Sequence, residues 1–135
     1  MLIVDTSVLI DVLEDDPRWA DWSIAQMRGQ AKVHELCINP VIYAELSLMF
    51  ESVEALDAVI ARMELCFQEL PRAALFLAGK AFVRYRKKGR SKQNVLADFF
   101  IGAHAAVQRC GILTRDARRY RAYFPTVELL TPARG

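Results

Sequence analysis

Short apolar runs alternate with amphipathic segments along the whole chain. The runs are no longer than a buried strand and predict β-strands. We expect these strands at residues 2–4, 33–38, 66–70, 112–114 and 127–130. Between them, apolar residues recur with helical spacing. They predict helices at residues 8–13, 17–30, 40–50, 53–63, 71–88 and 94–109, with a turn or short helix at 117–124. This alternation is typical of an α/β domain whose mostly parallel sheet is covered by helices on both faces.

The first strand brings a carboxylate to a place where ligands bind. Residues 2–4 are apolar without interruption, as expected of a central parallel strand that is buried on both faces. Asp5 follows directly, and with Thr6 and Ser7 it forms a polar helix start whose side-chain oxygens can accept hydrogen bonds from free backbone N–H groups. Because ligands bind at the carboxyl ends of strands in open α/β sheets, Asp5 is a candidate site residue.

Glu45 is a second acid in apolar surroundings. Its neighbours one helical turn away are apolar: Val41, Ile42, Leu48 and Met49. We therefore expect the Glu45 side chain to point into the core.

Two further acids lie in the second half of the chain. Asp98 has Val95 and Ile101 on its helix face, and Asp116 follows a predicted strand with the hydroxyl of Thr114 two residues earlier. Asp116 thus repeats the arrangement at the end of the first strand.

Asp11 serves as a comparison because it lies on a polar helix face. Its neighbours are Ser7, Glu14 and Asp15. We expect Asp11 to face solvent and to take no part in the site.

A buried carboxylate without a partner costs several kcal/mol unless it is neutralised, paired or bound to a metal. For any one acid, pairing with an arginine or a backbone N–H is the simpler explanation. All four acids, however, fall at the carboxyl ends of predicted strands or in the first turns of the following helices, so they can converge on one crevice. Oxygen ligands without histidine or cysteine suit Mg²⁺ or Mn²⁺, and such a site beside basic groups suits phosphoryl chemistry. The sequence has no serine or cysteine nucleophile motif and no glycine-rich phosphate loop.

Length and composition narrow the class of protein. The 135 residues predict one domain, spanning residues 1–135. No apolar run is long enough for a membrane span and the N-terminus lacks a signal-peptide pattern, so we expect a cytoplasmic protein without membrane association. Cys37, Cys66 and Cys110 form no C-x-x-C pair, and we interpret them as small buried hydrophobic side chains rather than a disulfide or a zinc site.

The net charge of +2 conceals a strong asymmetry. Residues 1–69 carry 4 Lys/Arg and 13 Asp/Glu, whereas residues 70–135 carry 14 Lys/Arg and 3 Asp/Glu. This asymmetry indicates binding to nucleic acid or to an acidic partner. The alternative is that an acidic and a basic face hold the domain together or drive self-association.

Four motifs in order make the chain resemble PIN-domain proteins of the VapC-like toxin family. They are "LIVDTSVLID", "NPVIYAEL", "LADFFIGAHA" and the closing segment "GILTRDARRYRAYFP" with "VELLTP". The resemblance implies a three-layer α/β/α fold with a five-stranded parallel sheet in the order 3-2-1-4-5. It also implies an Mg²⁺- or Mn²⁺-dependent endoribonuclease, a cognate antitoxin whose tail occupies the active-site groove, and a homodimer.

The resemblance also assigns roles to individual residues. It implies that Asp5, Glu45, Asp98 and Asp116 bind the metal and form the catalytic site, with Thr6 and Thr114 as supporting hydroxyls. Many relatives carry a further acid where this chain has Arg119, so the number of metal ions stays open.

Basic residues of the second half are candidates for binding the RNA backbone beside the acidic pocket. They are Arg84, Arg86, Lys87, Lys88, Arg90, Lys92, Arg115, Arg118, Arg119 and Arg121. Tyr85, Tyr120 and Tyr123 lie among them and are candidates for stacking on unpaired bases. The alternative interpretation is a solvated helix end with tyrosines that belong to the core or to a dimer surface.

Two other functions remain open. The chain could be a non-catalytic RNA- or protein-binding module that retains the acidic pocket. A small-phosphate hydrolase of the haloacid-dehalogenase type would require a second aspartate two residues after Asp5, where this chain has Ser7. The apolar helices between residues 40 and 63 are candidates for a dimer or antitoxin surface.

Overall fold

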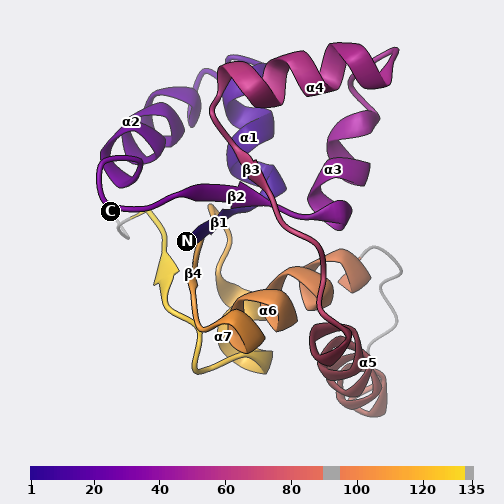
Figure 1. The fold of residues 1–135 in the computed structure, drawn as a ribbon. Coiled ribbons are helices and arrows are strands. Elements are labelled where there is room, and N and C mark those ends of the chain that lie inside the picture. Colours follow the sequence, from indigo (N-terminus) through magenta and orange to yellow (C-terminus); the bar gives the residue numbers. More distant parts are fainter. Residues whose placement is uncertain (90–94, 133–135) are drawn as a thin grey trace.

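Five short parallel strands form one sheet at the centre of the molecule (Figure 1). The computed structural model describes residues 1–89 and 95–132. The strands are β1 (Leu2–Val4), β2 (Leu36–Ile38), β3 (Cys66–Phe67), β4 (Gly111–Leu113) and β5 (Leu129–Leu130). Their order is β3-β2-β1-β4-β5 and every pairing is parallel, so the predicted fold class and strand order are confirmed.

Helices cover both faces of this sheet and complete three layers. They are α1 (Thr6–Leu13), α2 (Ala20–Gln30), α3 (Pro40–Ser47), α4 (Val53–Arg62), α5 (Arg72–Lys87), α6 (Leu96–Gln108) and α7 (Arg118–Tyr123). In Figure 1, α1 to α4 lie above β2, whereas α5, α6 and α7 lie below it. Within the described residues, no helix is long and apolar enough to cross a membrane.

The central strand β1 is the most deeply buried part of the sheet. Its three residues are at most 2% exposed, and β1 pairs with β2 on one side and β4 on the other. This burial on both faces agrees with its uninterrupted apolar sequence. On the α6 side, Gly102 leaves room for the ring of Phe124, which packs directly against the helix backbone.

Several predicted elements begin later than expected, and two of them show why. The Asp16 side chain accepts hydrogen bonds from the backbone N–H groups of Arg18 and Trp19, at 2.8 and 2.9 Å, and this turn delays the start of α2 to Ala20. The second strand begins at Leu36 rather than at Val33, whose side chain is 74% exposed. Local polar contacts and exposure therefore shorten elements that the apolar pattern made longer.

The helix start at Asp5 is not capped by its own carboxylate. Asp5 is the N-cap residue of α1, but its side chain caps no backbone N–H group. The carboxylate instead accepts hydrogen bonds from the hydroxyls of Thr114 and Ser7. The predicted capping role of this side chain is therefore wrong, because the Asp5 carboxylate is hydrogen-bonded to Thr114, which follows β4.

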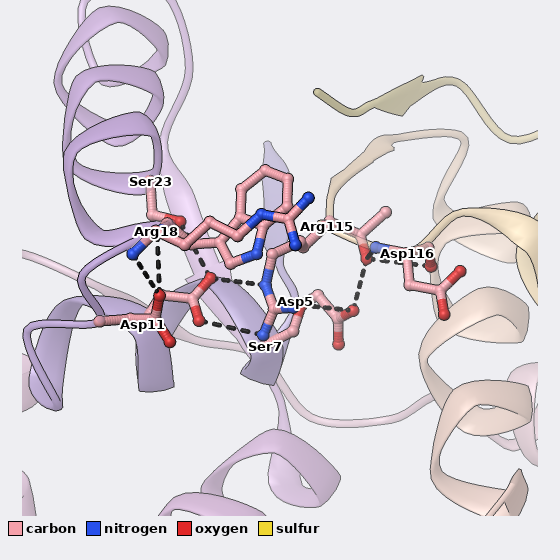
Figure 2. Close-up of polar contacts among 10 residues, drawn as sticks. Asp5, Ser7, Asp11, Arg18, Ser23, Arg115 and Asp116 are labelled. Atoms are coloured by element: carbon pink, nitrogen blue, oxygen red, sulfur yellow. Dashed lines mark hydrogen bonds and ion pairs between the residues drawn. The ribbon is translucent and has the colours of Figure 1, made fainter. Parts of the chain in front are cut away.

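Asp11 is buried, so its predicted exposure to solvent is wrong. Its side chain is 2% exposed. The carboxylate accepts hydrogen bonds from Nε and Nη2 of Arg115 at 2.7 and 3.0 Å and from the hydroxyl of Ser23 at 3.3 Å (Figure 2). Ser23 belongs to α2 and Arg115 follows β4, so both partners come from other parts of the chain. Asp11 therefore binds partners from within the protein, whereas its neighbours Glu14 and Asp15 are exposed.

We predict that Arg115→Met lowers the free energy of unfolding by about 2 to 3 kcal/mol, because it leaves the buried Asp11 carboxylate without a cation. Chemical denaturation at neutral pH measures this loss. The double variant Asp11→Leu/Arg115→Met should recover part of it, since no uncompensated charge then remains.

Arg118→Met is the matched control for this ion pair. Arg118 pairs with Asp116, and the two side chains are 86% and 59% exposed. Stability should therefore stay nearly unchanged in this variant. Equal losses for Arg115→Met and Arg118→Met would contradict the structural role of the buried pair.

Candidate active site

A cavity of about 430 Å³ contains all four acids that the sequence singled out. It lies where the chain leaves β1 and β4, beside the second turn of α3 and the first turn of α6 and against α7. Its lining residues are Asp5, Thr6, Ser7, Ile10, Glu45, Tyr85, Asp98, Asp116, Arg118, Arg119, Ala122 and Tyr123. The structure thus brings the four carboxylates together, and their role in metal binding stays a prediction.

Asp5 is the most buried of the four, with 7% of its surface exposed. Its Oδ2 accepts hydrogen bonds from the hydroxyls of Thr114 at 2.6 Å and Ser7 at 3.3 Å. The pKa of Asp5 is raised to about 6: burial is the largest cause, the Thr114 hydroxyl opposes it, the charges of Asp98 and Glu45 add to it, and the Ser7 hydroxyl opposes it slightly. Thr114 is one of the two predicted supporting hydroxyls and does contact an acid of the site.

Glu45 lines the pocket from α3 but does not point into the core. The residue is half-buried, and its Oε1 accepts a hydrogen bond of 2.6 Å from the hydroxyl of Thr6, the second predicted supporting residue. Because α3 ends at Ser47, Leu48 is 88% exposed and does not shield Glu45. Burial raises the pKa of Glu45, the Thr6 hydroxyl lowers it, and the charge of Asp98 raises it.

Asp98 is paired with an arginine inside the pocket. It lies in the first turn of α6, and its Oδ2 accepts a hydrogen bond from Nη1 of Arg119. The two side chains are 31% and 29% exposed, so this ion pair is largely removed from solvent. Burial nevertheless raises the pKa of Asp98 above its usual value, with Arg119 acting in the opposite direction.

Asp116 differs from the other three because its side chain is 59% exposed. Nε and Nη2 of Arg118 donate to its two carboxylate oxygens at 3.1 and 3.0 Å, and this guanidinium holds the pKa of Asp116 below the usual value. The prediction of apolar surroundings is wrong here. β4 ends at Leu113, and the backbone N–H of Asp116 donates to the Thr114 hydroxyl in a turn that carries the carboxylate to the surface.

The three more buried acids influence one another electrostatically. The charge of Asp98 raises the pKa of both Asp5 and Glu45, and the charge of Glu45 raises that of Asp5. Like charges that are held together in this way favour a cation between them. By donor type, carboxylate oxygens fit Mg²⁺ or Mn²⁺, and because oxygens from three of the described acids do not all lie within 4.8 Å of one another, water would have to supply part of the ligand shell.

Tyr120 lies below these acids and has an unused hydroxyl. The residue is 1% exposed, and its buried hydroxyl has no hydrogen-bond partner among the described residues. Burial raises the pKa of this phenol well above its usual value, and the charges of Asp5, Asp98 and Glu45 raise it further. Sequence reasoning missed this position, because nothing in the local pattern marks a tyrosine that lies beneath acids from three other elements.

The tyrosines do not offer the predicted stacking faces. Tyr85 and Tyr123 are 3% and 7% exposed, and their ring centroids lie 5.5 and 5.1 Å from that of Phe99. They expose only parts of their surface to the pocket. The interpretation of Tyr85, Tyr120 and Tyr123 as core residues is the correct one.

The predicted RNA-binding residues lie in different places. Arg118 and Arg119 line the pocket, whereas Arg115 belongs to the buried pair with Asp11. Near the end of α5, four basic side chains are exposed: Arg84, Arg86, Lys87 and Lys88. Arg121 is exposed on α7, and Arg90 and Lys92 lie outside the described residues.

A separate group of possible ligand atoms lies on β2, on β3 and on the residue before β2. A carboxylate oxygen of Glu35 and the Sγ atoms of Cys37 and Cys66 lie within 4.8 Å of one another. The three cysteines are free; Cys37 is buried as predicted, whereas Cys66 and Cys110 are half-buried. Burial raises the pKa of the Cys37 thiol to about 12, so it is protonated at neutral pH and is a poor metal ligand in that form.

The sequence and the fold were compared with those of known proteins. The family model described as "PIN domain" matches residues 2–125. No curated protein matches the sequence. Three solved structures share the fold over 96% of this chain. The first is VapBC2 from Rickettsia felis bound to a promoter DNA fragment, with 17% identity, 97% of that chain covered and a TM-score of 0.73. The second is DNA-bound VapBC from Salmonella typhimurium, with 18% identity, 96% of that chain covered and a TM-score of 0.70. The third is VapBC-1 from nontypeable Haemophilus influenzae, with 16% identity, 96% of that chain covered and a TM-score of 0.69.

The raised pKa of Asp5 predicts how stability depends on pH. An acid whose pKa is about 6 in the folded state and 3.8 when unfolded stabilises the fold below pH 4, and this stabilisation is lost as pH rises through 6. The difference corresponds to about 3 kcal/mol. In chelator, Asp5→Asn should therefore raise the free energy of unfolding at pH 7.5 by up to about 3 kcal/mol and change it little at pH 4.

Asp116→Asn is the control of opposite sign. The pKa of Asp116 is lowered in the folded state, so its contribution is present above pH 4 and is lost as pH falls. Denaturation curves from pH 4 to 8 distinguish the two variants. A loss of stability at pH 7.5 in Asp5→Asn would contradict this account of the pocket.

Proposed function

The chain belongs to the PIN-domain family, and from this premise we propose that it is an endoribonuclease that uses Mg²⁺ or Mn²⁺ to hydrolyse RNA phosphodiester bonds. The observation that carries the proposal is the pocket itself. Carboxylates from four parts of the chain meet there beside two arginines, at the carboxyl edge of a parallel sheet. This combination suits a divalent ion and an anionic phosphodiester together.

In this proposal Asp5, Glu45 and Asp98 hold the ion, and Asp116 stands at the rim. When bound, the ion neutralises charge on the reacting phosphate and makes water a better nucleophile. The protein's own groups prepare this site. The Thr114 and Thr6 hydroxyls fix one oxygen each of Asp5 and Glu45, which keeps those carboxylates oriented.

Hydrolysis requires a water molecule to attack phosphorus while the P–O3′ bond breaks. The O3′ atom takes up a proton, so one product ends in a 3′-hydroxyl and the other in a 5′-phosphate. Arg119 lies within the pocket, where its guanidinium can bind the phosphate oxygens, and the exposed basic residues of α5 offer contacts to the RNA backbone further out.

We further propose that the chain is the toxin of a toxin–antitoxin pair and forms a homodimer in the cytoplasm. The fold likeness to VapBC structures supports this role. Apolar side chains at the α3–α4 end of the molecule are available for protein contacts, since Leu48 is 88% and Val53 61% exposed. An antitoxin tail in the acidic pocket would exclude RNA from the same place.

A non-catalytic binding module is the second candidate. It is favoured by the arginine partners of two acids, because Arg119 and Arg118 already neutralise part of the charge of Asp98 and Asp116. Such a module would bind RNA or protein without turnover and without need of a metal ion.

The enzyme proposal predicts metal-dependent RNA cleavage by the purified, antitoxin-free chain. With Mg²⁺ or Mn²⁺ present, a panel of structured RNAs should yield products with 3′-hydroxyl and 5′-phosphate ends, and EDTA should stop the reaction. Asp5→Asn should reduce the rate at least 100-fold, because the central carboxylate loses its charge while Thr114 keeps an oxygen to bind. Gel analysis with end mapping measures both effects.

Asp21→Asn provides the control, since Asp21 is an exposed acid in the first turn of α2 outside the pocket. Its activity should equal that of the unmodified chain. Cleavage that survives both EDTA and Asp5→Asn would overturn the proposal. RNA binding that is independent of metal, of Glu45→Gln and of Asp98→Asn would instead favour the non-catalytic module.

A further inference from the structure

The two arginines of the pocket are bound to its acids in different ways. Arg118 is 86% exposed, and two of its nitrogen atoms donate to both carboxylate oxygens of the exposed Asp116 at the rim of the pocket. Arg119 is only 29% exposed and contacts Asp98 through Nη1 alone. Arg119 is therefore the cation that belongs to the interior of the site.

The charges of the interior group do not balance without an added ion. Once the Asp116–Arg118 pair is set aside, three carboxylates and one guanidinium remain: Asp5, Glu45, Asp98 and Arg119. When all are ionised their net charge is −2. One divalent ion neutralises this charge, whereas two ions would give the interior group a net charge of +2 when no RNA is bound.

The oxygen atoms of the three acids lead to the same number of ions. Asp5 Oδ2 accepts from Thr114, Glu45 Oε1 accepts from Thr6 and Asp98 Oδ2 accepts from Arg119. The Tyr120 hydroxyl lies close to the carboxylates of Asp5 and Asp98, so of the three acids Glu45 has the freest second oxygen. Among the described residues, oxygens from three of these acids do not all lie within 4.8 Å of one another, so an ion such as Mg²⁺ would take one or two of them directly and keep water for the rest. A second ion would need the oxygen that Arg119 occupies.

Arg119 also retains capacity for substrate. A guanidinium carries five N–H donors in a planar fork, and the contact with Asp98 uses one nitrogen. The remaining donors are available at the cavity, where phosphate oxygens can be bound at two points.

We propose that Arg119 is the fixed second cation of this active site, so that the pocket binds one divalent ion and Arg119 binds the RNA phosphate next to it. The inference rests on the proposed function for its metal and its substrate. It makes Arg119 a catalytic residue that contacts the reacting phosphate, and it explains why one acid of the site is tied to an arginine.

Counting bound metal tests the inference without any cleavage assay. Mn²⁺ titrations of the RNA-free chain, followed by the electron paramagnetic resonance of free Mn²⁺ and by calorimetry, should give one ion per chain. Arg119→Glu should bind two ions, because it replaces the fixed cation with another ligand. Arg119→Gln should bind its first ion several-fold more tightly, since a positive charge beside the site is removed.

Arg118→Gln is the matched control for the metal count, because it removes the neighbouring pocket arginine at the exposed rim. It should still bind one ion, with a smaller change in affinity than Arg119→Gln. Two ions in the unmodified chain, or one ion in a folded Arg119→Glu chain, would overturn the inference and leave the enzyme proposal standing. No Mn²⁺ bound at all would instead overturn both. Circular dichroism confirms that each variant is folded.

Cleavage kinetics test the contact with phosphate. Arg119→Gln should lower kcat/KM at least 100-fold at saturating Mn²⁺, and Arg119→Lys should restore part of the loss because it returns the charge without the planar fork. Arg62→Gln, an exposed arginine of α4, should have unchanged activity. Full activity of Arg119→Gln would contradict a role in binding the reacting phosphate.

Discussion

The site holds three carboxylates near one another and away from water, where their negative charges repel each other. Much of the surrounding structure provides groups that reduce this repulsion. The parallel sheet creates it, because the chain leaves β1 and β4 at the same edge and the helices α3 and α6 begin nearby. Each acid then receives a donor from a different element, and Asp5 also accepts a weaker hydrogen bond from the nearby Ser7. Thr114, Thr6 and Arg119 supply these donors, and none of them is a sequence neighbour of the acid that it contacts.

The hydrogen bonds only partly offset the cost of burying these carboxylates. Burial still raises the pKa of Asp5, Glu45 and Asp98 after the hydrogen bonds have acted. The buried Asp11–Arg115 pair differs in its contacts, with two bonds between its charged groups and a third from Ser23. The pocket stores unfavourable charge that an added cation relieves, which is the usual relation between stability and function at such sites.

The sequence was sufficient for the fold and for the membership of the pocket, because both depend on patterns that repeat along the chain. Apolar strands and amphipathic helices alternate, and acids stand at the strand ends, so Asp5 and Asp98 could be placed from local rules. Those rules failed where contacts come from elsewhere. Asp11 is buried by α2 and Arg115, and Glu45 faces a pocket because α3 ends before Leu48 can cover it. The position of the Tyr120 hydroxyl and the pairing of Arg119 with Asp98 likewise depend on where α7 docks.

The short helix α7 places three consecutive residues in three different environments. Arg118 lies at the exposed rim, Arg119 lies in the pocket and Tyr120 lies in the core, which follows from the rotation of about 100° between successive residues of a helix. The loop before α7 therefore cannot change length freely during evolution. The gain of a single codon there would rotate Arg118 into the pocket and carry Arg119 to the buried position of Tyr120. Homologues that retain this site should accordingly vary in the identity of these side chains before they vary in the number of residues between β4 and α7.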